Sequence, residues 1–237
     1  MKRSFRLLVA VVGLLMLSAC VTVTPNFAAK PEFWNDKNKI VGVAIEQPPK
    51  PTAFKAGSQG LLDVAINQAN ASELETHLNG LDVSKISDLA DRVVTHLRQK
   101  GFMVKRIKDP IQTDGLAKLD NKDEGSQSQV ILADRDFRPL KEKHGVDKMV
   151  LISVVRIGTI RNYYGFIPLG EPTGLCHLAG KVVNLSNNQL EWSQVVTQTT
   201  PNADGSWDVP PNYPGLTKAV YTAFDQSRDM LFNQFAQ

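Results

Sequence analysis

A run of apolar residues in the second half of the chain constrains the fold more than any other feature. Residues 149–155 read Met-Val-Leu-Ile-Ser-Val-Val, so apolar side chains occupy almost every position. Because successive side chains of a strand point to opposite faces of a sheet, this run predicts a strand that is covered on both faces. The chain of 237 residues, 42% of them hydrophobic, is long enough to build such layers.

The patterns around this run predict an α/β fold with one mixed sheet. Helices separate the first three predicted strands, so we expect crossovers to make those strands parallel, and the last three strands should form an antiparallel meander with helices packed on the sheet. We predict strands at 39–45, 102–108, 149–160, 174–185 and 189–200; helices at 61–78 with a break near Asn70, from Asp82 or Ser84 to Gly101, at 137–144 and at 216–235; and loops at 46–60, 109–134, 161–173 and 201–214.

The first twenty residues carry a targeting pattern. A short cationic segment precedes an apolar run, 7–17, that is too short to span a bilayer, and the run ends in Leu-Ser-Ala-Cys20. These residues resemble the bacterial lipoprotein signal, in which the cysteine is lipidated and becomes the new amino terminus. An ordinary secretory signal with a chance cysteine is the alternative.

The lipoprotein resemblance implies a particular organisation of the chain. Residues 1–19 are then a signal peptide, 20–38 are the lipidated N-terminus and a tether, and 39–237 form a single periplasmic α/β domain. Cys20 would carry a diacylglyceryl group, and its amine would be acylated, for example by palmitate. Val21 after the cysteine favours the periplasmic face of the outer membrane.

Charge argues against one class of partner. The formal net charge is +3, and Lys2, Arg3 and Arg6 lie before Cys20, so the chain from Cys20 onward is formally neutral. A neutral domain lacks the electrostatic attraction that nucleic acid requires, and we expect no nucleic-acid partner.

The cysteines indicate a fold without disulfides. Once Cys20 is lipidated, only Cys176 remains, and a single cysteine cannot form an intrachain bond. We predict that Cys176 is a small buried hydrophobe. A catalytic thiol would need a basic partner, but its neighbour His177 should point to the opposite face of the strand.

The C-terminal hairpin carries a family resemblance. It reads Gly180-Lys-Val-Val-Asn-Leu185, then Gln189-Leu-Glu-Trp192-Ser193. Together with the signal and the element order, it resembles bacterial lipoproteins with a TolB-amino-terminal-like or curli-secretion-lipoprotein-like α/β periplasmic domain. Asn184 replaces the acid that is usual in those proteins. The resemblance implies an envelope protein partner and leaves homo-oligomerisation open.

Aromatic side chains gather in two of the predicted loops. If the parallel assignment holds, these loops leave from the carboxyl edge of the sheet, where α/β proteins bind ligands. Exposed aromatic residues suit a protein partner, and their rings also stack on sugars. We therefore expect partner or ligand contacts at Tyr163, Tyr164, Phe166, Trp207 and Tyr213; alternatively, the first loop folds back over the sheet as local packing.

No catalytic motif stands out. The four histidines lack metal-ligand spacing, a calcium loop at 120–125 is defeated by Lys122, and the glycines of 57–60 lack the lysine of a phosphate-binding loop. We expect a non-catalytic accessory or scaffold lipoprotein in envelope assembly or export, with no metal and no cofactor. The alternatives are a glycan- or small-ligand-binding module on the same loops and, less favoured, a hydrolase using Asp204, Asp208 or the acids of 109–134.

Overall fold

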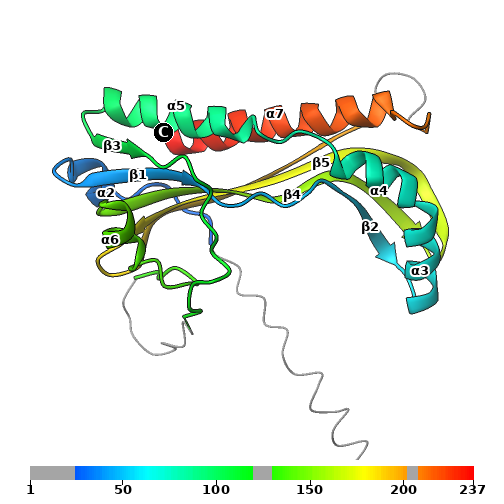
Figure 1. Cartoon of the computed structure of the whole chain (residues 1–237), viewed down its shortest axis with the longest axis horizontal. Helices are drawn as coiled ribbons and strands as arrows, with labels where there is room; N and C mark the ends of the chain where they lie inside the picture. The colour runs from blue at the N-terminus through cyan, green and yellow to red at the C-terminus, as the bar shows by residue number, and fades with distance from the viewer. Residues whose placement is uncertain (1–24, 120–129, 202–207) are drawn as a thin grey trace, which may run out of the picture.

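The computed structural model describes residues 25–119, 130–201 and 208–237, which form one open mixed sheet with packed helices, as predicted (Figure 1). The strand order is β3-β1-β4-β5-β6, and β2 pairs with β4 beside this path. The elements are α2 (Pro31–Asn35), β1 (Ile40–Ile45), β2 (Thr52–Ser58), α3 (Leu61–Asn70), α4 (Ser72–Asn79), α5 (Ile86–Gln99), β3 (Met103–Arg106), α6 (Leu140–His144), β4 (Lys148–Tyr164), β5 (Ile167–Asn184), β6 (Gln189–Thr200) and α7 (Pro214–Ala236).

Strand β4 is the centre of the sheet. Strands β1 and β2 pair with it in succession along one side, both in parallel, while β5 pairs with it antiparallel along the other side. Strands β1, β3 and β4 are parallel, and β4, β5 and β6 form the antiparallel meander, so both halves of the predicted topology are confirmed.

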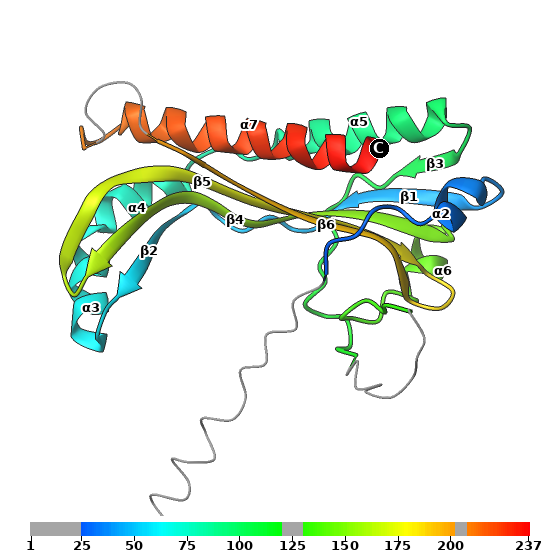
Figure 2. The ribbon, with the colours of Figure 1, turned by 180° about the vertical axis from the view of Figure 1, so that it is seen from behind.

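The sheet is covered on both faces where β4 begins. Val150, Ile152 and Val154 belong to a core cluster with α5 and α7, whereas Met149 and Leu151 pack on the opposite face with α6 and the segment before it. Figure 2 shows α5 and α7 lying together along one side of the sheet, with α6 on the other side. The continuous apolar run thus has the two-sided burial that its sequence predicts.

Two predicted loops are wrong in part, because both contribute strands. Residues 52–58 of the predicted loop 46–60 form β2, and residues 161–173 belong to β4 and β5, which continue to a tight turn at Gly165-Phe166. Glycine and proline made both segments resemble loops. Gly158 lies in β4 beside β2; its φ is 140°, and an added Cβ would lie 2.0 Å from the backbone oxygen of Thr52. That glycine therefore permits the close approach of β2 to β4.

The predicted tether is also shorter than expected. Of residues 20–38, the structure describes 25–38, and these pack against the domain. Phe27 forms an isolated bridge with Ser193, and α2 places the fully buried ring of Phe33 beside Phe102. Asp36 lies 3.2 Å from the Nζ of buried Lys148, which lies 2.9 Å from the carboxylate of Glu191. The segment has no steady period, because single anchoring residues rather than a regular face attach it.

Glycine 174 sets how closely α7 approaches the sheet. A Cβ added there would lie 2.3 Å from the carbonyl carbon of Ala219, which is helix backbone and cannot move alone. We expect Gly174→Ala to lower the free energy of unfolding by about 1–3 kcal/mol, the usual cost of overpacking. The control is Gly115→Ala, where an added Cβ meets nothing within 4 Å and the change should stay within about 0.5 kcal/mol. Urea unfolding of the full-length proteins measures both, and equal stabilities would contradict this account of the packing.

Candidate functional site

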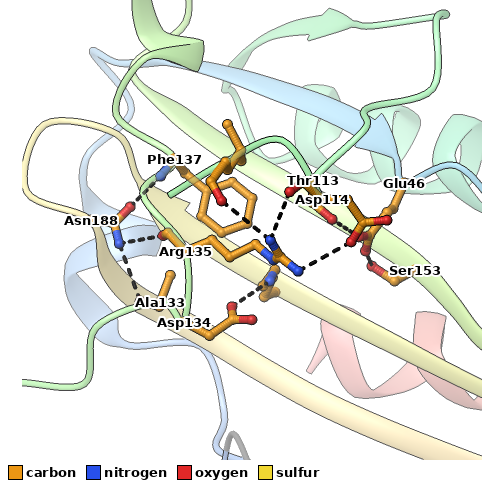
Figure 3. Close-up of polar contacts among 11 residues, drawn as sticks. Glu46, Thr113, Asp114, Ala133, Asp134, Arg135, Phe137, Ser153 and Asn188 are labelled. Atoms are coloured by element: carbon orange, nitrogen blue, oxygen red, sulfur yellow. Dashed lines mark hydrogen bonds and ion pairs between the residues drawn. The ribbon is translucent and has the colours of Figure 1, made fainter. Parts of the chain in front are cut away.

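The carboxyl edge of β1, β3 and β4, where α/β sheets usually bind ligands, is filled by the chain itself. Glu46 follows β1, and its carboxylate accepts hydrogen bonds from the hydroxyls of Thr113 and Ser153 (Figure 3). Thr113 comes from the long segment after β3, and Ser153 from β4. This contact holds the segment against the sheet, and the three side chains are hydrogen-bonded to one another.

Of the acids predicted as hydrolase candidates in 109–134, Asp114 and Asp134 are paired with cations. Asp114 lies 3.2 Å from Arg135, and Asp134 lies 3.2 Å from Lys181. Buried Asn188 completes the attachment, because its amide donates to the carbonyl of Arg135 at 2.8 Å and accepts from the N–H of Phe137 at 2.8 Å (Figure 3). The calcium-like residues 120–125 and Asp204 lie outside the described residues. Among those described, no group of His, Cys, Asp and Glu could hold a metal ion.

Cys176 is a buried residue, as predicted. Its side chain is fully buried, and burial raises the pKa of its thiol to about 12. Its neighbour His177 pairs with Arg156 in the ladder and belongs to the opposite face of β5. The thiol therefore has neither the exposure nor the basic partner that a nucleophile requires.

A second region lies at the other end of the sheet, and more of its large side chains are exposed to solvent. Here α3 and α4 lie beside β2 and the turn between β4 and β5 (Figure 1). Buried Asn67 joins the helix to the turn, since its amide donates to the carbonyl of Gly165 at 3.1 Å and to Gln59 at 2.8 Å. The start of α3 is not open to an anion, because the N–H of Gly60 donates to the carboxylate of Asp63 at 2.8 Å.

A cavity of about 270 Å³ lies between these elements. Its lining comes from β2, from the β4–β5 hairpin, from α3 and α4 and from the segment before α7. Apolar side chains such as Phe54, Leu74 and Pro168 line it together with Lys55, Asn70, Arg161, Tyr163, Phe166, Asp208 and Tyr213. We call this the hairpin cavity.

The predicted contact residues divide between the hairpin cavity and the outer surface. Tyr163, Phe166 and Tyr213 line the cavity, although Tyr213 is only 8% exposed and its ring packs 5.5 Å from that of His77. Tyr164 alternates with Tyr163 along β4, belongs to the other face and is 69% exposed. Trp207 lies outside the described residues. The aromatic residues that were expected to form one surface thus divide into two sets, with Phe166, which is 59% exposed, common to both.

This end of the molecule also has exposed apolar side chains that the sequence patterns do not identify as a surface. Leu61 and Leu62 of α3 are 95% and 74% exposed, and the hairpin adds Phe166 at 59%. We name the full set the hairpin-end surface: Leu61, Leu62, Val64, Ile66, Tyr164, Phe166, Ile167 and Leu169. The sequence did place Leu61, Leu62 and Ile66 on one face of a helix, but periodicity cannot tell whether such a face packs within the same chain or against another molecule.

Comparison with known proteins yields fold neighbours of low similarity. No protein-family model matches the chain, and no curated protein sequence matches it. Similar solved structures include a Xanthomonas campestris protein of family DUF330, with 13% identity over 89% of this chain and 85% of that chain at a TM-score of 0.33. PelC from Paraburkholderia phytofirmans, solved as a dodecamer, has 10% identity over 91% and 96% at 0.32. Lipoprotein GNA1162 from Neisseria meningitidis has 12% identity over 80% and 99% at 0.28.

These neighbours include a bacterial lipoprotein, but TM-scores this low provide no basis for transferring a function. None of the helices in the described residues has the length and apolarity needed to cross a membrane.

The environment of Cys176 predicts an unreactive thiol. With a pKa of about 12, roughly one molecule in ten thousand carries a thiolate at pH 8, and burial blocks that fraction as well. In full-length protein carrying Cys20→Ser, we expect a thiol reagent to label Cys176 only as the protein unfolds. Adding an exposed cysteine through Ser72→Cys provides the control, which should react within seconds. Rapid labelling of Cys176 in the folded state would overturn this interpretation.

Proposed function

We propose that the protein is a non-catalytic lipoprotein, anchored through Cys20 at the periplasmic face of the outer membrane, that serves as an accessory or scaffold in envelope assembly or export. The hairpin-end surface carries the proposal. Large exposed apolar groups in a soluble domain mark sites of interaction, because leaving them in water is unfavourable. Here they stand on a helix and a hairpin that are fastened together by Asn67.

The rigidity of this surface supports a protein partner. The hairpin is held by paired strands up to Gly165, and α3 is fixed to it, so binding would immobilise few additional residues. The polar side of α3 carries Asp63, Asn67 and Gln68 and no Lys or Arg, which is unlike the cationic polar face of helices that lie on anionic membranes. We therefore assign the surface to a protein rather than to lipid.

The shortened tether supports a domain held close to its anchor. Pro25 is the first described residue, and it lies five positions after Cys20, a reach of about 18 Å at most. Phe27 and α2 then attach the chain to the body of the domain. A lipid on Cys20 would thus hold the domain near the membrane surface rather than on a long flexible leash.

The partner surface predicts a position-dependent crosslinking pattern. We place a photoreactive residue at Leu62 or Tyr164 and, as a control, at Met103, which is 50% exposed on β3 at the far end of the sheet. We expect a discrete protein adduct from the first two positions in intact cells and none from Met103. Adding Leu62→Glu should lower the Tyr164 adduct roughly tenfold and change stability by less than about 0.5 kcal/mol, since Leu62 is exposed. Equal adducts at all three positions, or none at Leu62 and Tyr164, would refute the proposed surface.

Lipidation at Cys20 predicts where the protein is found. We expect Cys20→Ala to abolish incorporation of labelled palmitate and to move the protein out of the outer-membrane fraction, because several acyl chains are needed for stable anchoring. Cys176→Ala is the matched control and should remain lipidated, since Cys176 is buried in the domain. Unchanged membrane association and labelling of Cys20→Ala would contradict the proposal.

A further inference from the structure

The cationic side chains in the wall of the hairpin cavity are bonded within the chain. Lys55 of β2 and Arg161 of β4 are direct partners in the parallel ladder, and both line the cavity. Lys55 donates to the carbonyl of Ala53 at 3.1 Å and to the side-chain oxygen of Gln68 at 2.8 Å. Arg161 donates to the carbonyl of Gly170 at 2.8 Å. Because each cation already has an oxygen acceptor, charge does not select what the cavity can hold.

The rest of the lining is mainly apolar, and every element around the cavity contributes to it. Four aromatic rings take part, from β2, from the β4–β5 hairpin and from the residue before α7. An apolar group that enters such a cavity leaves water, and an aromatic group gains more, since ring pairs stabilise contacts beyond the area that they bury. The apolar lining consists of Ala53, Phe54, Ala71, Leu74, Tyr163, Phe166, Pro168, Pro172, Pro210 and Tyr213.

The ring of Tyr213 reaches the cavity wall from a backbone conformation that bulky residues rarely adopt. Its φ is 39°, in the left-handed region, at the residue that precedes α7. The ring packs 5.5 Å from that of His77, whose Nε2 lies 2.7 Å from the hydroxyl of Thr217. Backbone strain of this kind persists only where the surrounding structure holds it, and it concentrates at binding sites. The strain at Tyr213 is therefore a second, independent observation that points to a binding role for this cavity.

The hairpin cavity is continuous with the hairpin-end surface. Phe166 belongs to both, because it lines the cavity and is also 59% exposed. On α3, Ile66 of the surface is followed directly by Asn67 of the lining. A protein that covers the hairpin-end surface would therefore also lie against the wall of the cavity.

We propose that the hairpin cavity receives one aromatic side chain of the protein that covers the hairpin-end surface. The inference rests on the protein contact proposed above and specifies the chemistry of the partner. The cavity volume of about 270 Å³ lies just below the range of about 300–1,000 Å³ typical of small-molecule pockets, and it suits a single large side chain. Interfaces obtain most of their affinity from a few such side chains that fill pockets, while the apolar groups around them exclude water.

The chemical preference of the cavity can be tested without the partner. We place the full-length protein in phosphatidylcholine nanodiscs, so that no detergent competes, and titrate it with single blocked amino acids while recording NMR spectra. The probes are N-acetyl-tryptophanamide, N-acetyl-leucinamide and the blocked amide of glutamate. We expect the tryptophan probe to bind at least fivefold more tightly than the other two and to shift the amide signals of Ala71 and Tyr163. Equal binding of the leucine probe, tighter binding of the glutamate probe, or no shift at these signals would overturn the inference.

Variants locate the binding. Ala71→Phe adds a ring to the lining and should weaken binding of the tryptophan probe at least tenfold, whereas Ser72→Phe adds the same ring at an exposed position outside the lining and should leave it unchanged. Tyr163→Leu keeps an apolar side chain but removes a ring, so it should lower the preference for tryptophan over leucine at least twofold. Thermal unfolding shows whether each variant is folded, and Tyr163→Leu decides the question if Ala71→Phe is not. Unchanged binding in the folded variants would refute the site.

Crosslinking in cells separates this inference from the protein contact on which it rests. With the photoreactive residue at Leu62, we expect Ala71→Phe to lower the protein adduct at least fivefold and Ser72→Phe to leave it unchanged. If Leu62 gives the same adduct in both variants and in the unsubstituted protein, the contact stands and the insertion of an aromatic side chain is wrong. If Leu62 gives no adduct in the unsubstituted protein, the contact itself is wrong and the inference fails with it.

Discussion

The structure depends on β4, which is long enough to pair with two shorter strands, β1 and β2, one after the other along the same side. β4 runs from Lys148 to Tyr164, and its hydrogen bonds on one side are shared between β1 and β2. Residues 48–51, three of which are prolines, separate these two strands, because proline cannot donate to a ladder. The result is a sheet with two regions, one built on β1, β3 and β6 and the other on β2 and the hairpin turn.

The two regions differ in what covers them. Around β1 the sheet carries α5 and α7 on one face and the described residues 107–119 and 130–140 on the other. Its edge is occupied by Glu46, Thr113 and Ser153. Around β2 the covering helices are the short α3 and α4, and α3 buries little besides Asn67. The proposed binding surface therefore lies at the hairpin end rather than at the edge that α/β topology favours, since the chain's own side chains already fill that edge.

The sequence predicts the elements that follow local rules, but it does not predict which apolar faces are buried within the chain. The apolar run at 149–155, the helix ended by Gly101 and the hairpin turned at Asn188 follow local rules, and all three were predicted. β2 was missed because its residues, Thr52–Ser58, gain order from the register with β4 rather than from their own propensity. The exposure of Leu61 and Leu62 could not be predicted, because an apolar helix face has the same period whether it packs within the chain or on a partner. The pairing of Lys55 with Arg161 likewise cannot be predicted until the register of β2 on β4 is known.

The attachment of the N-terminal segment bears on the proposed anchoring at Cys20. Lys148 is almost fully buried, and its charge is matched by Glu191 at 2.9 Å and by Asp36 at 3.2 Å. A buried charge without a partner is strongly destabilising, so the first residue of β4 requires an acid from β6 and another that follows α2. The same lysine lies 5.6 Å from the centre of the Phe33 ring, which α2 inserts into the core. Withdrawing the N-terminal segment would thus expose an aromatic core residue and remove one of the two carboxylates around a buried cation. A lipid on Cys20 would consequently be joined to the core of the sheet through the packed N-terminal segment. The hairpin-end surface lies at the other end of the same strand, β4.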